Sequence, residues 1–219
     1  MKKALIPLLL CTLAATAAAK QYATGADDET DGMIDIKGSR FKLLAVNYHN
    51  GHQCELEGRI KNGSWHDGRG CVVRFQFSGK NKDKLDISGD DGCRSYCGAK
   101  GSFDGTYTAI PALCTAPGSK AAEKRYQAAY RAKRYAQALE TKRQYADQCG
   151  RFTAYTLRIK TYNDLADSYK HTGDKAACRQ SLAEIATWFE QEIPSTYLAD
   201  KDFRREQKRY EANQKACAE

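Results

Sequence analysis

The sequence predicts an α+β fold of two domains: a small disulfide-bonded antiparallel β sandwich or barrel, followed by a domain of α-helical hairpins. Three observations lead to this prediction. Apolar residues alternate with a period of two in the first half of the chain. From about residue 120 they recur instead with the period of an amphipathic helix. The chain also contains nine cysteines in 219 residues, which is typical of a disulfide-rich protein.

The N-terminus has the layout of a secretory signal peptide. Lys2 and Lys3 are followed by an apolar run over residues 4–13 and by small residues up to Ala19. The apolar run is too short to span a bilayer as a helix, which needs about 20 residues. We therefore expect residues 1–19 to be a signal peptide cleaved near Ala19, and the protein to be periplasmic or secreted. Cys11 leaves lipid anchoring open, although Leu10 before it is not a small residue.

Residues 20–32 are polar and acidic, and we expect a flexible lead-in there. Residues 33–110 then read as the β domain. Asn-Gly, Asp-Gly and Ser-Gly pairs separate the runs of alternating residues, as in hairpin turns. In one run, Cys54, Leu56 and Ile60 share a face, and charged residues fill the other. The strands that we expect are 33–37, 41–48, 54–61, 71–77 and 84–88.

Eight cysteines remain after the signal peptide, and an even number in an exported chain predicts disulfides. Pairing is open, because eight cysteines allow on the order of a hundred arrangements. Five of them precede residue 118 and three follow it, so complete pairing requires a bridge between the halves. The eight cysteines are Cys54, Cys71, Cys93, Cys97, Cys114, Cys149, Cys178 and Cys217.

Cys93 and Cys97 stand four residues apart in the most distinctive segment of the chain, residues 91–107. This spacing alone is a weak signal for zinc. His49, His52 and Cys54 could form a partial site, but no convincing second ligand pair is nearby, so we expect no metal. We expect two bridges among Cys54, Cys71, Cys93 and Cys97 to clamp the last hairpin onto the sheet.

Two sequence motifs in the first half of the chain resemble those of a known β module. They are Cys-x-x-x-Gly at 54–58 and Cys-x-x-x-Cys-Gly-Ala-x-Gly-Ser-x-Asp-Gly at 93–105. The region 33–110 resembles a β module of Gram-negative envelope proteins and, in outline, the small β-barrel inhibitors of c-type lysozyme. The Ser-Gly-x-x-Tyr loop of those inhibitors is missing. The resemblance implies an inhibitor or immunity protein against a lysozyme-like cell-wall hydrolase.

The second half, after a linker at 111–119, is expected to be helical over residues 120–219. Four amphipathic stripes are visible, and Gly150 and Gly173 are expected to end helices. The second stripe includes a lysine, Lys142. A last helix is expected at about 198–216. The stripes contain Ala122, Tyr126, Ala129 and Tyr130; Tyr135, Ala138, Leu139, Lys142, Ala146 and Cys149; Tyr155, Ile159, Tyr162, Ala166 and Tyr169; and Cys178, Leu182, Ile185 and Phe189.

An internal repeat relates residues 133–139 to residues 173–179. Both segments resemble the turn and second-helix start of tetratricopeptide repeats (TPR), which implies a TPR-like helical domain. We expect Cys149 to pair with Cys178, because one ends a helix and the other begins one. Cys114 would then pair with Cys217 and join the two halves.

The basic excess of the chain, a formal net charge of +8, lies mainly in residues 119–219. In an exported protein this does not favour nucleic acid, and the absence of a later apolar run predicts no membrane insertion. No phosphate-binding loop, nucleophile elbow or zinc-protease motif is present. We therefore expect no cofactor and no enzymatic activity, with a cell-wall enzyme as the remaining catalytic alternative.

These expectations combine into a non-catalytic, protein-binding protein of the bacterial envelope. Its partner would be a cell-wall hydrolase or another envelope protein. Either of two surfaces could hold the partner: the 93–107 segment, as in an inhibitor, or the helical groove, as in a TPR-type adaptor. The candidate contacts are Arg94, Tyr96, Lys100 and Phe103 on the first surface, and Asn163, Tyr169 and Lys170 on the second.

Overall fold

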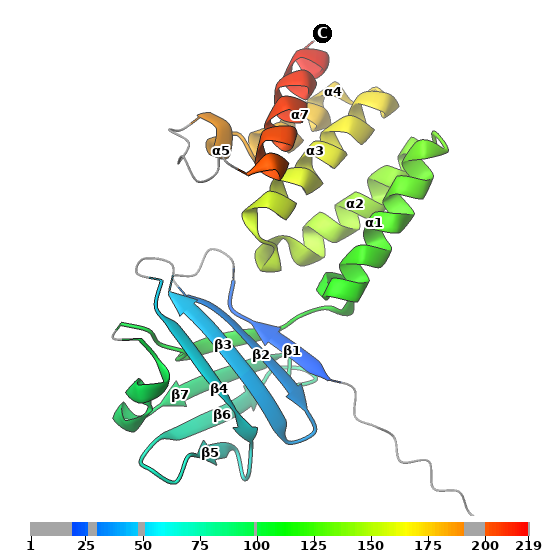
Figure 1. The fold of residues 1–219 in the computed structure, drawn as a ribbon. Helices are drawn as coiled ribbons and strands as arrows, with labels where there is room; N and C mark the ends of the chain where they lie inside the picture. The colour runs from blue at the N-terminus through cyan, green and yellow to red at the C-terminus, as the bar shows by residue number, and fades with distance from the viewer. Residues whose placement is uncertain (1–18, 26–29, 48–50, 99, 191–199, 219) are drawn as a thin grey trace, which may run out of the picture.

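The computed structural model describes residues 19–25, 30–47, 51–98, 100–190 and 200–218. An antiparallel sheet contains the strands, and all of the α-helices follow it in the chain (Figure 1). Residues 1–18, where we expect the signal peptide, lie outside the described residues. None of the helices in the described part of the chain is long and apolar enough to cross a membrane.

The eight strands form a nearly closed up-and-down barrel. Their order in the sheet is β4-β3-β2-β1-β8-β7-β6-β5, so strands that follow one another in sequence pair, except β4 and β5 at the two edges, and β1 pairs with β8. At the open seam between β4 and β5, an isolated bridge joins Lys61 to Ser64. The strands are β1 (Lys20–Ala23), β2 (Thr30–Lys37), β3 (Arg40–Asn47), β4 (Gln53–Arg59), β5 (Ser64–His66), β6 (Val72–Ser78), β7 (Lys84–Gly89) and β8 (Gly105–Ala109).

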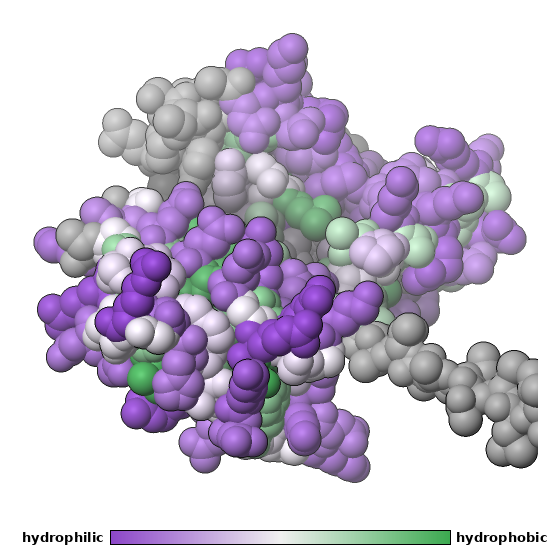
Figure 2. All heavy atoms as spheres, turned by 60° about the horizontal axis from the view of Figure 1, so that its bottom comes forward, coloured by the Kyte–Doolittle hydropathy of each residue, from purple (hydrophilic) through white to green (hydrophobic). Residues whose placement is uncertain are grey.

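The alternation seen in the sequence places one face of each strand inside the barrel. In β3, Phe41, Leu43 and Ala45 are buried, and the residues between them are exposed. In β4, Cys54 and Leu56 are buried, as predicted. The face seen in Figure 2 is mostly hydrophilic, with small, separate apolar areas. The inward-facing residues pack into a single core, which also includes Tyr22, Ile34, Ile36, Val73, Phe75, Leu85, Ile87, Phe103 and Tyr107.

The predicted lead-in over residues 20–32 is wrong at both ends, because residues 20–23 form β1 in the middle of the sheet and residues 30–32 begin β2. β1 joins β2 to β8 and so links the two ends of the meander. Tyr22 is buried in the core, and its hydroxyl donates a hydrogen bond to the Lys82 carbonyl at 3.0 Å. Four residues are too few to display a clear period, so local pattern alone could not identify this strand. β5 and β8 were missed as well.

Helices make up the rest of the described chain. Thr115 caps the first helix by accepting from the Gly118 N–H, at 3.4 Å, and Pro117 lies in its first turn. Gly173 ends the third helix at φ 82°, as expected of a glycine stop. The helices are α1 (Ala116–Arg131), α2 (Tyr135–Cys149), α3 (Tyr155–Thr172), α4 (Lys175–Ala183), α5 (Thr187–Glu190) and α7 (Lys201–Ala218), with short 3-10 turns η1 (Asp91–Tyr96), η2 (Ala112–Cys114) and η3 (Gly150–Phe152).

Each of the helices α2 to α4 packs on the one before it, and α7 returns to pack on α3 and α4. The residues Ile159 and Ala166 of the third stripe and Cys178, Leu182 and Ile185 of the fourth are buried, and the two stripes meet in one apolar cluster. Phe203 and Tyr210 of α7 close this cluster. The assignment of these hairpins to a TPR-like repeat stays a prediction.

Four disulfides pair all of the described cysteines. Cys54 bonds to Cys97 and Cys71 to Cys93, so these four pair among themselves, as predicted. Such bridges fit an oxidising, extracellular or periplasmic location.

The predicted pairs Cys149–Cys178 and Cys114–Cys217 are wrong. Cys114 bonds to Cys149, because η2 folds back onto α1 and α2. Cys178 bonds to Cys217, because α7 packs on α4. The bridge that parity requires is therefore Cys114–Cys149, and it lies within the helical part instead of joining that part to the barrel.

Candidate functional site

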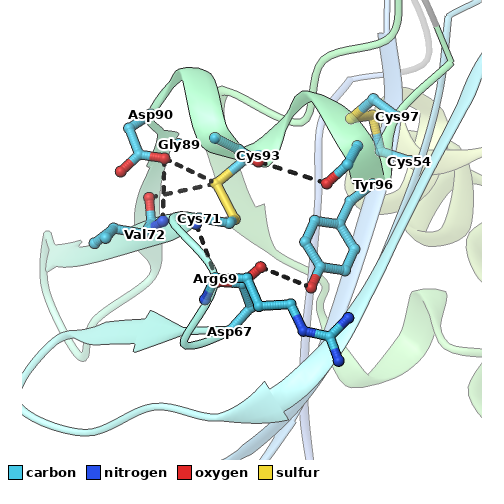
Figure 3. The surroundings of a disulfide bond; sticks show 12 residues. Cys54, Asp67, Arg69, Cys71, Val72, Gly89, Asp90, Cys93, Tyr96 and Cys97 are labelled. Atoms are coloured by element: carbon cyan, nitrogen blue, oxygen red, sulfur yellow. Dashed lines mark hydrogen bonds between the residues drawn. A yellow bond between two sulfur atoms is a disulfide. The ribbon is translucent and has the colours of Figure 1, made fainter.

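The predicted loop surface is a clasp across the barrel seam. We call residues 91–97, which comprise η1 and Cys97, the seam clasp. One disulfide ties Cys97 to Cys54 in β4, and the other ties Cys93 to Cys71, immediately before β6 (Figure 3). The seam clasp thus holds both sides of the opening between β4 and β5, where the ladder of backbone hydrogen bonds is interrupted.

Hydrogen bonds fix the seam clasp to the turn before β6. The Tyr96 hydroxyl donates to Oδ2 of Asp67 at 3.1 Å, while Oδ1 of Asp67 accepts from the backbone N–H groups of Arg69 and Cys71 (Figure 3). The hydrogen bond from Arg69 is the main reason why the pKa of Asp67 is lowered. The Tyr96 ring also meets Trp65 edge to face, with centroids 5.6 Å apart. Both the hydroxyl and the ring of Tyr96 are therefore used in contacts with the barrel.

The four predicted contacts of this loop separate into two kinds. Phe103 is only 3% exposed and belongs to the barrel core, so it has almost no area to offer a partner. Tyr96 is partly buried, as described above. Arg94 is exposed and forms an ion pair with Asp91 at 3.0 Å, and Lys100 is exposed too. The loop therefore presents the two cations and not the two aromatic residues.

A hollow of about 250 Å³ lies beside the seam clasp, but its acidic groups serve the local fold. Oδ1 of Asp90 accepts from the Val72 N–H at 3.1 Å, and Oδ1 of Asp104 accepts from the Gly89 N–H at 2.7 Å. Cys71, Asp90 and Cys93 come close enough to suggest a metal site. The two sulfurs are bonded to each other, however, and a disulfide lacks the thiolate that zinc requires.

A second hollow, which sequence reasoning missed, has a volume of about 300 Å³ and lies between α1, α2 and α3. We call it the helical hollow. Alanine, leucine and tyrosine side chains supply most of its wall, and charged groups occupy its floor. The residues that line it are Ala116, Ser119, Lys120, Ala122, Glu123, Thr141, Lys142, Tyr145, Leu157 and Lys160.

Three charged residues that line the helical hollow, Glu123, Lys142 and Lys160, form a closed ring of ion pairs with the buried Asp164 behind them. Nζ of Lys142 lies 2.6 Å from Oε2 of Glu123 and 2.7 Å from Oδ2 of Asp164. Nζ of Lys160 lies 2.7 Å from Oε1 of Glu123 and 2.7 Å from Oδ2 of Asp164. We call these four residues the ionic ring. Three helices contribute to it, so it ties α1, α2 and α3 together.

The ionic ring is buried to different depths. The side chains of Lys142 and Asp164 are 4% and 2% exposed, whereas that of Glu123 is 34% exposed at the mouth. Burial alone would raise the pKa of Glu123, but the hydrogen bonds from Lys142 and Lys160 outweigh it and lower the pKa to about 2. Tyr126 lies beneath, with Nζ of Lys142 4.6 Å from its ring centroid. Glu123 is therefore ionised throughout the neutral range.

The ion pairs continue from the ionic ring into the interface between α3 and α7. Arg209 contacts Asp164 at 2.7 Å, Asp167 at 2.6 Å and Glu206 at 2.8 Å. Strong interaction with these carboxylates raises the pKa of Arg209, although desolvation by burial opposes it. The buried charged groups of the ionic ring and of the α3–α7 interface thus compensate one another within the protein.

The predicted contacts on the helices take part in this interface. Asn163 is fully buried and donates from Nδ2 to the Glu206 carbonyl at 2.9 Å. Lys170 contacts Asp167 and Oδ1 of Asn213. Tyr169 is partly buried against the apolar cluster of α3, α4 and α7. The structure brings these three residues to the contact between α3 and α7 and its surroundings, and not to the helical hollow.

The comparisons give no relative from which a role could be transferred: no family model, no curated protein and no solved structure matches this chain.

Proposed function

We propose that this chain is an exported, non-catalytic protein-binding protein of the bacterial envelope. Its four disulfides fit an oxidising compartment. The basic and apolar start of the sequence, followed by small residues, supports export through a signal peptide. The disulfides also hold both candidate surfaces in fixed shapes, which lowers the conformational entropy lost on binding.

The adaptor form of this proposal, in which the helices hold the partner, has the stronger support. The observation that carries it is the helical hollow, which combines apolar walls with a floor whose charges are already paired. A formed apolar hollow with a few fixed polar groups is the usual shape of a binding site. The contacts predicted from the sequence do not decide between the two forms. Tyr96 and Phe103 of the loop pack on the barrel, and Asn163, Tyr169 and Lys170 are engaged at or beside the contact between α3 and α7.

The pairing of the titratable groups supports the non-catalytic part of the proposal. A general acid or base needs a pKa near the working pH, whereas the pKa of Glu123 is held at about 2 by its two lysines. Each described cysteine is in a disulfide, so none of these eight offers a thiolate nucleophile.

Site-specific photo-crosslinking tests the adaptor form. A photoreactive residue in place of Thr141, at the helical hollow, should give a discrete adduct with an envelope protein. The same residue in place of the exposed Glu57, on the barrel wall, should not. Equal adducts from both positions, or none from Thr141, would contradict the adaptor form.

The inhibitor form is the second candidate, and the rigidity of the seam clasp favours it. Two disulfides fix this segment, and Arg94 and Lys100 are exposed on and beside it. The test is to mix the oxidised protein with c-, g- and i-type lysozymes and to follow the clearing of a cell-wall suspension. Inhibition at equal molar amounts, lost in Arg94→Glu but kept in Lys208→Glu, would support this form. Clearing without lysozyme would overturn the non-catalytic proposal.

A further inference from the structure

We propose that the helical hollow receives one apolar side chain of a partner protein, and that acidic residues flank this side chain in the partner. The inference rests on the adaptor form of the proposed function and adds the chemistry of the segment that is bound. It follows from the volume of the hollow, from the neutrality of its floor and from a line of exposed cations along α1.

The volume of the helical hollow suits one large apolar group. A protein cavity of about 150 Å³ with apolar walls holds a benzene molecule. The helical hollow, at about 300 Å³, has room for a leucine or phenylalanine side chain together with part of its backbone. Ala116, Ala122 and Leu157 supply apolar wall, and the Tyr145 ring adds to it. The walls therefore favour an apolar guest.

The charged groups at the helical hollow do not require a charged ligand. The two positive and two negative groups of the ionic ring balance, and each carboxylate in it is shared by both lysines. Oε1 of Glu123 also accepts from the Gln127 amide at 2.9 Å. Because these carboxylates are saturated, the one acidic side chain that lines the hollow is already compensated and does not repel an acidic partner strongly.

Outside the hollow, Lys120, Lys124 and Arg131 form a line of cations on α1. At 3.6 residues per turn, separations of four and seven residues place them on one side of the helix, opposite the buried residues Ala122 and Ala129. All three are exposed, and none makes an ion pair with an acidic side chain of the described residues. We call these three residues the cation line.

Helix stability explains Arg131, which lies in the last turn of α1, but not Lys120 and Lys124, because like charges four residues apart destabilise a helix. Exposed lysines also follow one another along α7, at Lys201, Lys208 and Lys215, but the cations of α1 begin at the helical hollow, which Lys120 lines. The cations of α1 therefore remain available to an acidic partner.

The length of the cation line distinguishes a protein segment from a small ligand. Eleven residues separate Lys120, which also lines the hollow, from Arg131. At about 1.5 Å per residue this is about 16 Å along the helix. A small organic anion in the hollow would reach Lys120 but not Arg131. An extended acidic segment, anchored by one apolar residue, reaches all three cations.

Blocked peptides test this inference by amide chemical-shift perturbation in the full oxidised protein. The probe is acetyl-Glu-Glu-Leu-Glu-Glu-amide, compared with the same peptide carrying Ser in place of Leu and with acetyl-Lys-Lys-Leu-Lys-Lys-amide. At millimolar concentration, the acidic leucine peptide should shift amide signals of residues 116–123, 141–145 and 157–160. The serine peptide should bind more weakly, and the basic peptide should not bind.

Three variants sharpen the test. Lys120→Glu should weaken binding by about fivefold, in line with the loss of an exposed charge pair. Ala116→Phe, which fills the hollow, should remove the preference for leucine over serine. Lys208→Glu makes the same charge change on the exposed side of α7 and should leave binding unchanged. Because all three positions are away from the ionic ring, the fold should be kept.

Four outcomes would overturn the inference: no shifts from the acidic leucine peptide, equal binding of leucine and serine peptides, equal binding of the basic peptide, or a free small carboxylate such as hexanoate binding as tightly as the peptide. The last would indicate a small-molecule site. If the peptides fail to bind as expected but the photoreactive residue at Thr141 still gives an adduct, only the proposed chemistry of the partner segment is rejected. If the peptide experiment and the crosslinking experiment both fail, the adaptor form is rejected.

Discussion

At the scale of single residues, Lys142 is a buried cation that ties two carboxylates of neighbouring helices together. It is 4% exposed and contacts two carboxylates, one of which, Asp164, is itself buried. Removing Lys142 leaves Lys160 as the remaining lysine partner of both carboxylates. Taking one partner from a buried ionic cluster costs more than the pair was worth, because the remaining charges are then less well compensated.

We predict that Lys142→Met lowers the free energy of unfolding by about 3 kcal/mol, because Glu123 and Asp164 each lose a partner. Chemical denaturation with the disulfides intact measures this. Lys124→Met, an exposed change on α1, should stay within about 0.5 kcal/mol of the parent. If the two variants were equally stable, the ionic ring would not be a stabilising element.

The free energy of unfolding should depend on pH through the ionisation of Glu123. Its pKa is lowered from 4.5 to about 2 in the folded protein, so between these values the unfolded chain binds the proton more tightly. The contribution is therefore complete above pH 4.5 and is lost as the pH falls through 2. We expect the parent to lose stability in this window more steeply than Glu123→Gln. Denaturation curves of both across the window provide the comparison, and parallel pH profiles would be the contrary result.

One residue in the sequence already indicated a buried ion pair among the helices. Lys142 falls on the buried stripe of its helix, between Ala138 and Cys149, where a lysine needs a partner. Its partners could not be named from the sequence, because Glu123 and Asp164 lie on other helices. Asn163 and Lys170 were selected as contacts for a related reason: polar residues on a helix look the same in sequence whether they face solvent or a neighbouring helix.

At the scale of elements, the seam clasp replaces the missing ladder between β4 and β5. Gly58 of β4 supports this closure, because a side chain there would meet the Trp65 ring, 2.2 Å from an added Cβ. The Trp65 ring in turn packs on Tyr96. The cysteine set of the seam clasp was predictable, because four cysteines fall within the β pattern. The seam itself was not, because it depends on where the short strands β1 and β5 pair.

We predict that replacing the cysteines of either bridge of the seam clasp by alanine destabilises the barrel. Loop-closure entropy gives about 4 kcal/mol for Cys54–Cys97 and about 3 kcal/mol for Cys71–Cys93, whose sequence separations are 43 and 22. Thermal unfolding followed by barrel tryptophan fluorescence checks the order. A larger loss from the shorter loop would mean that strand contacts, and not loop entropy, dominate.

At the scale of the whole molecule, the disulfides divide in the same way as the secondary structure. Two lie before residue 110 and two after it, so none of the four links the barrel to the helices. The wrong pairing in our prediction came from treating Cys114 as part of the first half. Its position in η2, which packs on α1 and α2, is a tertiary fact that spacing does not reveal.

This division predicts that the barrel folds without the helices. A fragment of residues 19–110 keeps all eight strands, both bridges of the seam clasp and the complete barrel core. We expect the oxidised fragment to unfold in one cooperative transition, at a temperature within a few degrees of the barrel transition in the full protein. Calorimetry of fragment and full protein makes the comparison. A fragment that stays unfolded would show that the barrel needs the helices, and the two parts would then have to be treated as one folding unit.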